Sequence, residues 1–201
     1  MALENVYSEP TISDLVLRFK DHQINLEPGF QRESVWTTTD RMRLIQSILA
    51  GYPIPSIFLY KRVHNGRNVY DVIDGKQRLE TILMFEQVGR FKRDRFDVKL
   101  DLGEEEGPGW YDWPIIRKYF PANRAALDGY KIQTVEVTGE LGQIIDLFVR
   151  INSTGKRLTS GEKRHARFYT SRFLKEAKSL VRRFQRYLPP RKFSRQLKSI
   201  G

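Results

Sequence analysis

The chain has 201 residues, 40% of them hydrophobic and 12% aromatic, so we expect one main domain with a sizeable core and a helical extension. It contains no cysteine, which excludes disulfide bonds, a thiolate nucleophile and a zinc site built on thiolates. The formal net charge is +11, which favours a polyanionic partner such as nucleic acid.

The first predicted element is a helix that begins at residues 11–14, where a Thr and an Asp have the spacing of a capping box. Leu15, Val16 and Phe19 supply its apolar face. A brief strand is predicted over residues 24–26. We interpret the helix as a packing element.

A Pro-Gly turn at residues 28–29 then leads into a polar loop that ends at Trp36. Gln31 and Arg32 lie in this loop and are candidate ligand groups. An arginine stacked on a structural tryptophan is at least as consistent with the local sequence.

A strong amphipathic helix follows, with apolar residues at helical spacing from Met42 to Leu49. We expect Asp40 to be its N-cap, and Gly51 and Pro53 to end it. The apolar stripe is interpreted as core.

Two β-rich runs come next, residues 56–62 and 70–73, and the Asn-Gly pair at 65–66 predicts a tight hairpin turn between them. The second run stops at an Asp-Gly pair, and apolar residues then recur in helical register. Residues 74–78 therefore lie at a predicted strand-to-helix turn. Such a turn suits an anion, because the first helical amides lack partners and Gly75 has no Cβ.

The side chains of this turn have functional and structural interpretations. Asp74 is a candidate ligand of a divalent cation, Gln77 of a phosphate or an attacking water, and Arg78 of phosphate oxygens. In the structural alternative, Asp74 caps the helix and Arg78 pairs with Glu33 or Asp71. Local chemistry alone favours this alternative, because polar clusters are often structural.

Residues 89–129 are the least regular part of the chain and include a clear loop at 103–109. An aromatic cluster follows the loop: Trp110, Tyr111, Trp113, Tyr119 and Phe120. Exposed rings would be able to stack on a flipped or unpaired base. Buried rings would form a satellite hydrophobic cluster, which is the commoner case.

Alternation at period two predicts a half-buried strand over residues 131–137, and helical spacing predicts a helix from Leu141 to Ile151. A loop leads from there to a final basic helix, for which Ser160 is the expected cap. The Pro-Pro pair at 189–190 ends that helix.

The surplus of positive charge lies in residues 160–201, which hold 13 of the 35 Lys and Arg residues and two of the 24 Asp and Glu residues. Residues 1–159 are therefore neutral overall. The basic segment 160–201 has three interpretations: a nucleic-acid contact, an interface with a partner, or a solvated face. A contact with the phosphate backbone implies strong salt dependence. The candidate DNA-binding residues are Arg164, Arg167, Arg182, Arg183 and Arg186.

Neither a charged-then-apolar leader nor a long apolar run is visible, so we expect a cytoplasmic protein without membrane contact. His22, His64 and His165 do not have the spacing of a metal site or a serine triad. The chain also has no His-Asn-His arrangement and ends in basic sequence at Gly201, so we expect no direct DNA cleavage by it.

Four blocks of sequence follow one another in order: residues 30–36, 44–55, 74–79 and 148–162. Together they resemble the N-terminal, ParB-like domain of GmrSD-type modification-dependent restriction endonucleases. The resemblance implies an α/β (α+β) ParB/sulfiredoxin-like domain over residues 1–159, with a small mixed sheet flanked by helices, and a basic helical extension over residues 160–201. Sulfiredoxin chemistry itself is excluded, because it needs a cysteine.

The resemblance also implies defence against phage or other foreign DNA, with nucleotide binding and hydrolysis in this domain and DNA cleavage by a separate HNH-type nuclease domain. Asp74, Gly75, Gln77 and Arg78 match the family's Asp-Gly-Gln-Gln-Arg signature, and Lys76 replaces its first Gln. The carboxylate, amide and guanidinium are kept, while the lysine adds a cation that can meet a phosphate.

The resemblance extends to two further polar pairs. Gln31 and Arg32 match the family's upstream pair, and Arg150 and Asn152 match its later block. We expect these segments and the turn to converge on one pocket for Mg²⁺ and an NTP. In that pocket Asp74 holds the metal, and the catalytic residues are Asp74, Gln77 and Arg78. The nucleotide-binding residues are Gln31, Arg32, Gly75, Lys76, Arg150 and Asn152.

The leading hypothesis is an NTP-hydrolysing regulatory domain of a DNA restriction system, which acts with a nuclease domain or subunit on DNA such as modified phage DNA. A non-enzymatic DNA-binding module that grips phosphate is the alternative, and a metal-dependent DNA nickase is a weaker one. The oligomeric state and the base of the nucleotide stay open.

Overall fold

The computed structural model describes residues 3–28, 36–102 and 107–153, together with 168, 171, 176 and 179. The chain forms two compact units. The larger unit comprises Glu4–Leu26 and Glu33–Thr138, and the smaller one comprises Met1–Leu3, Glu27–Arg32 and Gly139–Gly201. Within the described residues, none of the helices has the length and apolar character needed to cross a membrane.

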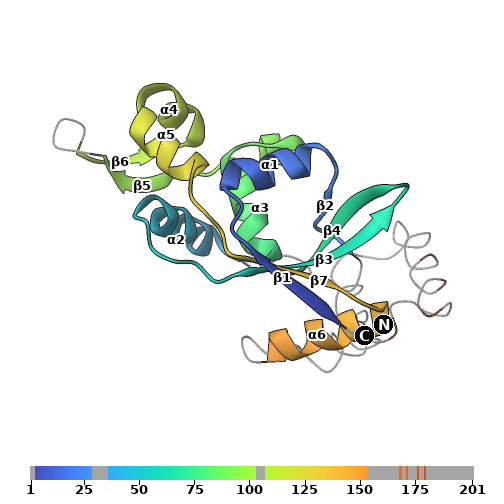
Figure 1. Cartoon of the computed structure of the whole chain (residues 1–201). Coiled ribbons are helices and arrows are strands. Elements are labelled where there is room, and N and C mark those ends of the chain that lie inside the picture. Colours follow the sequence, from blue (N-terminus) through green and yellow to red (C-terminus); the bar gives the residue numbers. More distant parts are fainter. Residues whose placement is uncertain are drawn as a thin grey trace, which may run out of the picture. The chain divides into compact units, whose positions relative to one another are not determined.

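A mixed five-stranded sheet organises the larger unit, in the order β1-β7-β3-β4-β2 (Figure 1). Neighbours alternate between antiparallel pairs (β1 with β7, β3 with β4) and parallel pairs (β7 with β3, β4 with β2). The mixed α/β class expected from the sequence is confirmed. The strands are β1 (Glu4–Ser8), β2 (Ile24–Asn25), β3 (Ile57–His64), β4 (Arg67–Asp74) and β7 (Thr134–Thr138).

The β3–β4 hairpin confirms the turn predicted from its Asn-Gly pair. Asn65 and Gly66 both have positive φ, 50° and 74°, and the flanking His64 and Arg67 are paired. Positive φ at both central residues matches the right-handed twist of the strands, which favours this turn in two-residue hairpins. β7 is shorter at its start than predicted, because Lys131 forms only an isolated bridge with Thr11.

Helices α1 (Ile12–Lys20) and α2 (Thr38–Leu49) both begin with a capping box. In α1, Thr11 is the N-cap as expected, and its hydrogen bonds lower the pKa of Asp14. In α2 the prediction of Asp40 as N-cap is wrong. Thr37 is the N-cap, and Asp40 is the third helical residue, whose carboxylate accepts from the Thr37 amide.

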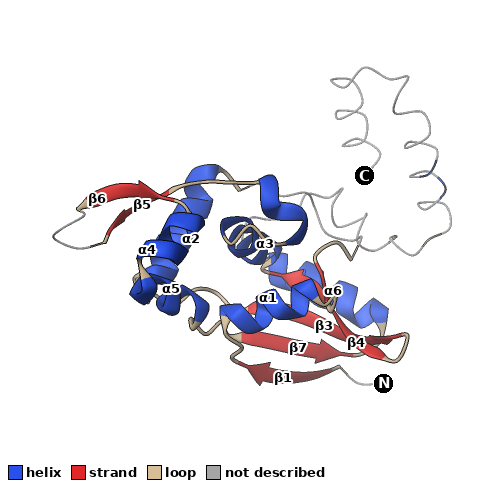
Figure 2. Ribbon diagram, turned by 90° about the horizontal axis from the view of Figure 1, so that it is seen from above, coloured by secondary structure: helices blue, strands red, loops and turns tan. Residues whose placement is uncertain are grey.

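Helix α3 (Lys76–Phe85) follows β4 directly and lies at the centre of the larger unit (Figures 1 and 2). Leu79, Ile82, Leu83 and Phe85 are fully buried in one core that also contains residues of α1, α2, β3 and β4. Burial on several sides of α3 fixes the position of the turn that precedes it.

The region expected to be least regular, residues 89–129, contains regular structure. It forms η1 (Gly89–Arg93), β5 (Val98–Asp101), β6 (Pro108–Tyr111), α4 (Trp113–Tyr119) and α5 (Pro121–Asp128). β5 and β6 pair with each other as a separate two-stranded sheet. None of these elements is longer than eight residues, so none is long enough to give a clear hydrophobic period.

The smaller unit contains α6 (Leu141–Ser153), which confirms the helix predicted from Leu141 onward. Its apolar residues Ile144, Ile145 and Phe148 are buried, while Asp146 is exposed. The predicted helix that starts after Ser160 lies outside the described residues, apart from single positions.

Candidate functional site

The site begins where β4 ends. Asp74 is the last residue of β4, and Gly75 is the N-cap of α3 in a left-handed conformation, with φ 89° and ψ 9°. Among the described residues no side chain caps the helix, and the N-cap is Gly75, so the structural alternative in which Asp74 is the cap is wrong. A Cβ on Gly75 would lie 2.9 Å from Ile57 Cγ1. The turn therefore requires glycine for its backbone angle and for its packing.

Arg78 is held over this turn by two acceptors. Its Nη2 donates to Asp74 Oδ2 at 2.7 Å and to the backbone carbonyl of Ser56 at 3.0 Å. Arg78 Nε is buried and has no hydrogen-bond partner among the described residues. A guanidinium fixed in this way is a preorganised donor beside the uncapped end of α3.

The structural alternative also paired Arg78 with Glu33 or Asp71. Glu33 lies outside the described residues. The pairing with Asp71 is wrong, because the ion pair of Arg78 among the described residues is with Asp74. Asp71 instead accepts from Arg62 Nε at 2.6 Å and from Asn25 Nδ2 at 2.6 Å. Asp71 thus ties three strands together within the sheet, and Asp74 is the carboxylate beside Arg78.

Lys76 lies along the helix and faces a buried carboxylate. Its Nζ is 3.7 Å from Glu80 Oε1, and Arg90 Nη2 is 4.0 Å from the same oxygen. The side chains of Lys76 and Glu80 are only 14% and 7% exposed. A phosphate would have to draw Lys76 away from Glu80 before this lysine could bind it. Gln77 is half-buried, and its backbone carbonyl accepts from the Thr81 hydroxyl.

The other predicted residues are distributed as follows. Gln31 and Arg32 lie outside the described residues, as do Arg164, Arg167, Arg182, Arg183 and Arg186. Arg150 is exposed on α6, and Asn152 belongs to the same helix, in the smaller unit. The structure brings together Asp74, Gly75 and Arg78. The convergence of the remaining residues on this turn stays a prediction.

No group of three His, Asp or Glu side chains suited to a metal ion occurs among the described residues. Asp74 alone provides a carboxylate at the turn, and Arg78 already occupies one of its oxygens. Mg²⁺ is commonly held by one or two carboxylates together with water and substrate phosphates. The turn therefore fits Mg²⁺ that arrives with a phosphate ligand, with Asp74 as the protein's contribution.

The sequence did not single out Glu86, the residue that follows α3. Burial, and secondarily the nearby carboxylate of Asp128, raises the pKa of Glu86 to about 7, against an opposing effect of Lys20. Its Oε1 is buried and accepts no hydrogen bond within the described part of the chain. A glutamate just after an apolar helix segment gives no sequence signal of this kind, because the charges near it come from α1 and α5.

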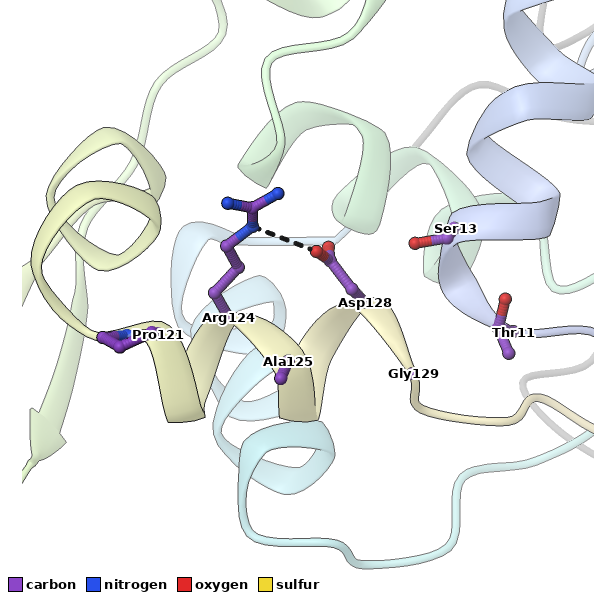
Figure 3. Close-up of a pocket in the computed structure, with 7 residues that line it drawn as sticks. All are labelled: Thr11, Ser13, Pro121, Arg124, Ala125, Asp128 and Gly129. Atoms are coloured by element: carbon purple, nitrogen blue, oxygen red, sulfur yellow. Dashed lines mark hydrogen bonds and ion pairs between the residues drawn. The ribbon is translucent and has the colours of Figure 1, made fainter.

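Asp128 itself lines an open pocket between the start of α1 and α5 (Figure 3). Arg124 Nε is 3.3 Å from Asp128 Oδ2 on the rim, and Ser13 faces them from α1. The acid and base on the rim neutralise each other. The pocket therefore has no net charge that would select an ionic ligand.

The aromatic cluster divides into buried and exposed rings. Trp113 is only 5% exposed and packs near Phe85, with ring centroids 5.9 Å apart. Trp110 and Tyr119 are 59% and 61% exposed. Trp113 is buried, but in the main core rather than in a satellite cluster, and the expectation of buried rings is wrong for Trp110 and Tyr119.

The comparison with known proteins identifies the family of the chain. A family model described as the N-terminal domain of GmrSD restriction endonuclease matches residues 12–169, which include the turn, α3 and most of the described residues. No curated protein matches the chain. Because residues 12–169 make up most of the 201 residues, the chain belongs to the family of GmrSD restriction endonuclease N-terminal domains.

Proposed function

We propose that this protein is a nucleotide-binding and NTP-hydrolysing regulatory domain of a DNA restriction system, which acts on DNA together with a nuclease part. The observation that carries the proposal is the turn between β4 and α3. There a left-handed glycine, an uncapped helix start and an anchored arginine meet beside one carboxylate. Membership of a restriction endonuclease family supports DNA as the larger target.

In this proposal the phosphates of the nucleotide lie against Gly75 and the first amides of α3. These amides lack acceptors within the helix and carry the positive end of its dipole. Arg78, together with Arg32, stabilises the charge that develops on the phosphate oxygens during transfer. Gln77 orients the attacking water through its amide.

The contact between Asp74 and Arg78 has a role in both states of the site. Without a ligand, the Asp74 carboxylate holds the guanidinium in place at 2.7 Å. With a nucleotide and Mg²⁺, Asp74 would be a ligand of the metal, which would supply charge neutralisation for the phosphates. Arg78 keeps the Ser56 carbonyl as its second acceptor, so it stays positioned when Asp74 turns to the metal.

Isothermal titration with ATP, GTP and CTP in Mg²⁺ tests the binding step. We expect saturable binding of one nucleotide by the wild-type chain and at least a tenfold loss of affinity in Arg78→Ala, because one charge-assisted contact is worth about 1.5 kcal/mol or more. Arg117→Ala removes an exposed arginine of α4 and is the matched control. Equal binding by Arg78→Ala and the control would exclude Arg78 from the site.

A turnover assay tests the catalytic step. We expect Asp74→Ala to abolish NTP hydrolysis while circular dichroism reports an unchanged fold. Asp97→Ala removes an exposed carboxylate from the same unit and controls for the loss of negative charge. Undiminished hydrolysis by Asp74→Ala would remove Asp74 from the mechanism.

A DNA-binding module without enzymatic activity is the second candidate, and the net charge of +11 is the observation that favours it. In that case the turn grips a DNA phosphate, and binding weakens steeply with salt. Added nucleotide would then change neither the affinity for duplex DNA nor its salt dependence, whereas a nucleotide-regulated domain would respond to it.

A further inference from the structure

A cationic surface lies in the larger unit, well away in sequence from the basic C-terminal segment. The eight residues 89–96 contain four basic residues and one acidic residue. They form η1 and the chain that follows it, between α3 and β5. Lys92, Arg93 and Arg95 are all exposed. We call these three residues the η1 cations.

The segment is anchored to the body of the unit by its aromatic residues. Phe91 is buried and packs against Phe19 of α1, with ring centroids 6.1 Å apart. Phe96 packs against Phe85 of α3, with centroids 5.4 Å apart. Gly89 has φ 57°, and a Cβ there would lie 3.2 Å from Phe19 Cε1. The backbone that carries the η1 cations is therefore seated on α1 and α3 before any partner binds.

No acidic side chain in the described part of the chain neutralises the η1 cations through an ion pair. Among the described residues, none of the three forms an ion pair, although Asp94 and Asp97 are close in sequence. Arg90 differs, because its Nη2 is 4.0 Å from Glu80 Oε1 and its guanidinium lies 5.0 Å from the centroid of the Phe91 ring. Arg90 thus has partners within the larger unit, while the η1 cations are exposed to an external anion.

We propose that the η1 cations bind the phosphate backbone of duplex DNA. The inference rests on the proposed function, which gives DNA as the target, and adds where the body of the domain meets it. Lys92 and Arg93 lie in η1, where the rise is about 2 Å per residue, and Arg95 lies two residues further along a non-helical segment. The η1 cations therefore lie within about 9 Å along the chain. Each DNA strand carries a phosphate about every 3.4 Å of helix axis, so a cluster of this size spans neighbouring phosphates. Contacts of this kind position a protein without reading sequence.

Fluorescence anisotropy with a labelled duplex tests the proposal, with the affinity measured at several salt concentrations. The variant Lys92→Gln/Arg93→Gln/Arg95→Gln should reduce the slope of log K against log salt by about 2 to 3, because each phosphate contact contributes about 0.9. The control Arg67→Gln/Arg117→Gln/Lys118→Gln removes the same charge from exposed positions elsewhere in the larger unit. Its slope should stay within about 1 of the wild-type slope.

A wild-type slope in the η1 variant would overturn the proposal. An equal reduction of the slope in the η1 variant and the control would also overturn it, because the effect would then reflect net charge alone. A wild-type chain that does not bind duplex DNA at low salt would also overturn it. Nucleotide titration of the same η1 variant separates this failure from failure of the proposed function. We expect the η1 variant to bind nucleotide with the affinity of the wild type. Arg78→Ala should lose nucleotide binding, but the slope of its DNA affinity against salt should still include the contribution of the η1 cations.

Discussion

Carboxylates lie near both ends of helix α3, but their charged neighbours differ. At the N-terminal end, Asp74 pairs with Arg78 at 2.7 Å, and Glu80 lies within 4.0 Å of both Lys76 and Arg90. At the C-terminal end, Glu86 lies near another carboxylate, and its pKa is raised to about 7. Burial raises the pKa of Glu86, and the opposing effect of Lys20 does not offset it.

This difference separates a binding end from a titrating end. The N-terminal end of α3 presents amides that have no acceptor within the helix and an excess of cations over carboxylates, which favours an anionic ligand. The C-terminal end carries a carboxyl group that exchanges protons in the physiological range. Four substitutions test whether the two ends differ in this way, and they follow from the largest expected effect to the smallest.

Gly75→Ala should have the largest effect on stability, about 3 kcal/mol. The left-handed angle costs a non-glycine residue about 1 to 2 kcal/mol, and a Cβ placed 2.9 Å from Ile57 Cγ1 adds the cost of overpacking, about 1 to 3 kcal/mol. Urea denaturation measures the free energy of unfolding of this variant. Gly66→Ala is the matched control, because Gly66 has φ 74° and no atom within 4 Å of the added Cβ. Equal losses in the two variants would show that packing against Ile57 does not constrain the turn.

Glu86→Gln should remove a pH dependence worth about 2 to 3 kcal/mol. The pKa of Glu86 is about 7 in the folded chain and 4.5 by reference, so the folded state binds the extra proton between these values. Stability of the wild type should therefore fall as pH rises from 4.5 to 7 and stay lower above it. Denaturation at pH 5 and pH 8 measures this difference, which the glutamine variant should lose. The control Asp97→Asn, at an exposed position, should keep the difference in stability between pH 5 and pH 8.

Asp74→Asn should destabilise the folded chain by about 1 to 2 kcal/mol. A fully buried ion pair loses about 3 to 5 kcal/mol when one partner is removed, but Asp74 is 31% exposed and solvent screens part of the interaction. The asparagine can still accept a hydrogen bond from Arg78, which limits the loss further. Thermal unfolding measures the effect. A change below that of the exposed control Asp97→Asn would mean that the N-terminal end does not depend on this pair.

Lys76→Gln should have the smallest effect, less than about 1 kcal/mol, because Arg90 still faces Glu80 Oε1 at 4.0 Å. The substitution also restores the glutamine of the Asp-Gly-Gln-Gln-Arg signature. A thermal-shift comparison with Lys76→Met, which cannot donate a hydrogen bond to Glu80, checks whether Arg90 compensates for the lost lysine. A large loss in Lys76→Gln alone would show that Arg90 does not compensate for the lysine.

Local sequence patterns predicted the elements with strong periodicity or turn chemistry. The helix capped by Thr11, the hairpin at Asn65 and Gly66, and the helix that begins at Leu141 are all observed. The cap of α2 was misassigned because Thr37 and Asp40 together form a capping box, in which either residue satisfies a simple capping pattern. The short elements between residues 89 and 129 were missed because they carry too few turns or alternations to show a period.

The family motif placed the turn and its candidate residues, but the roles of the side chains depended on contacts between distant segments. Pairing of β3 with β4 brings the Ser56 carbonyl to Arg78, and the packing of Ile57 makes Gly75 obligatory. Neither contact follows from spacing within residues 74–78. The same is true of Lys76, which the sequence offered to a phosphate and the structure directs toward Glu80.

By itself, the sequence determined the composition of this protein, its excess of positive charge, its glycine turn and the family to which it belongs, because these depend on residue identity and near neighbours. The tertiary structure decided which charges are paired and which are not. It gave Arg78 two acceptors, set Glu86 near Asp128, and left the η1 cations exposed. Pairing and burial are properties of segments far apart in the chain, so they arise only when the chain is folded.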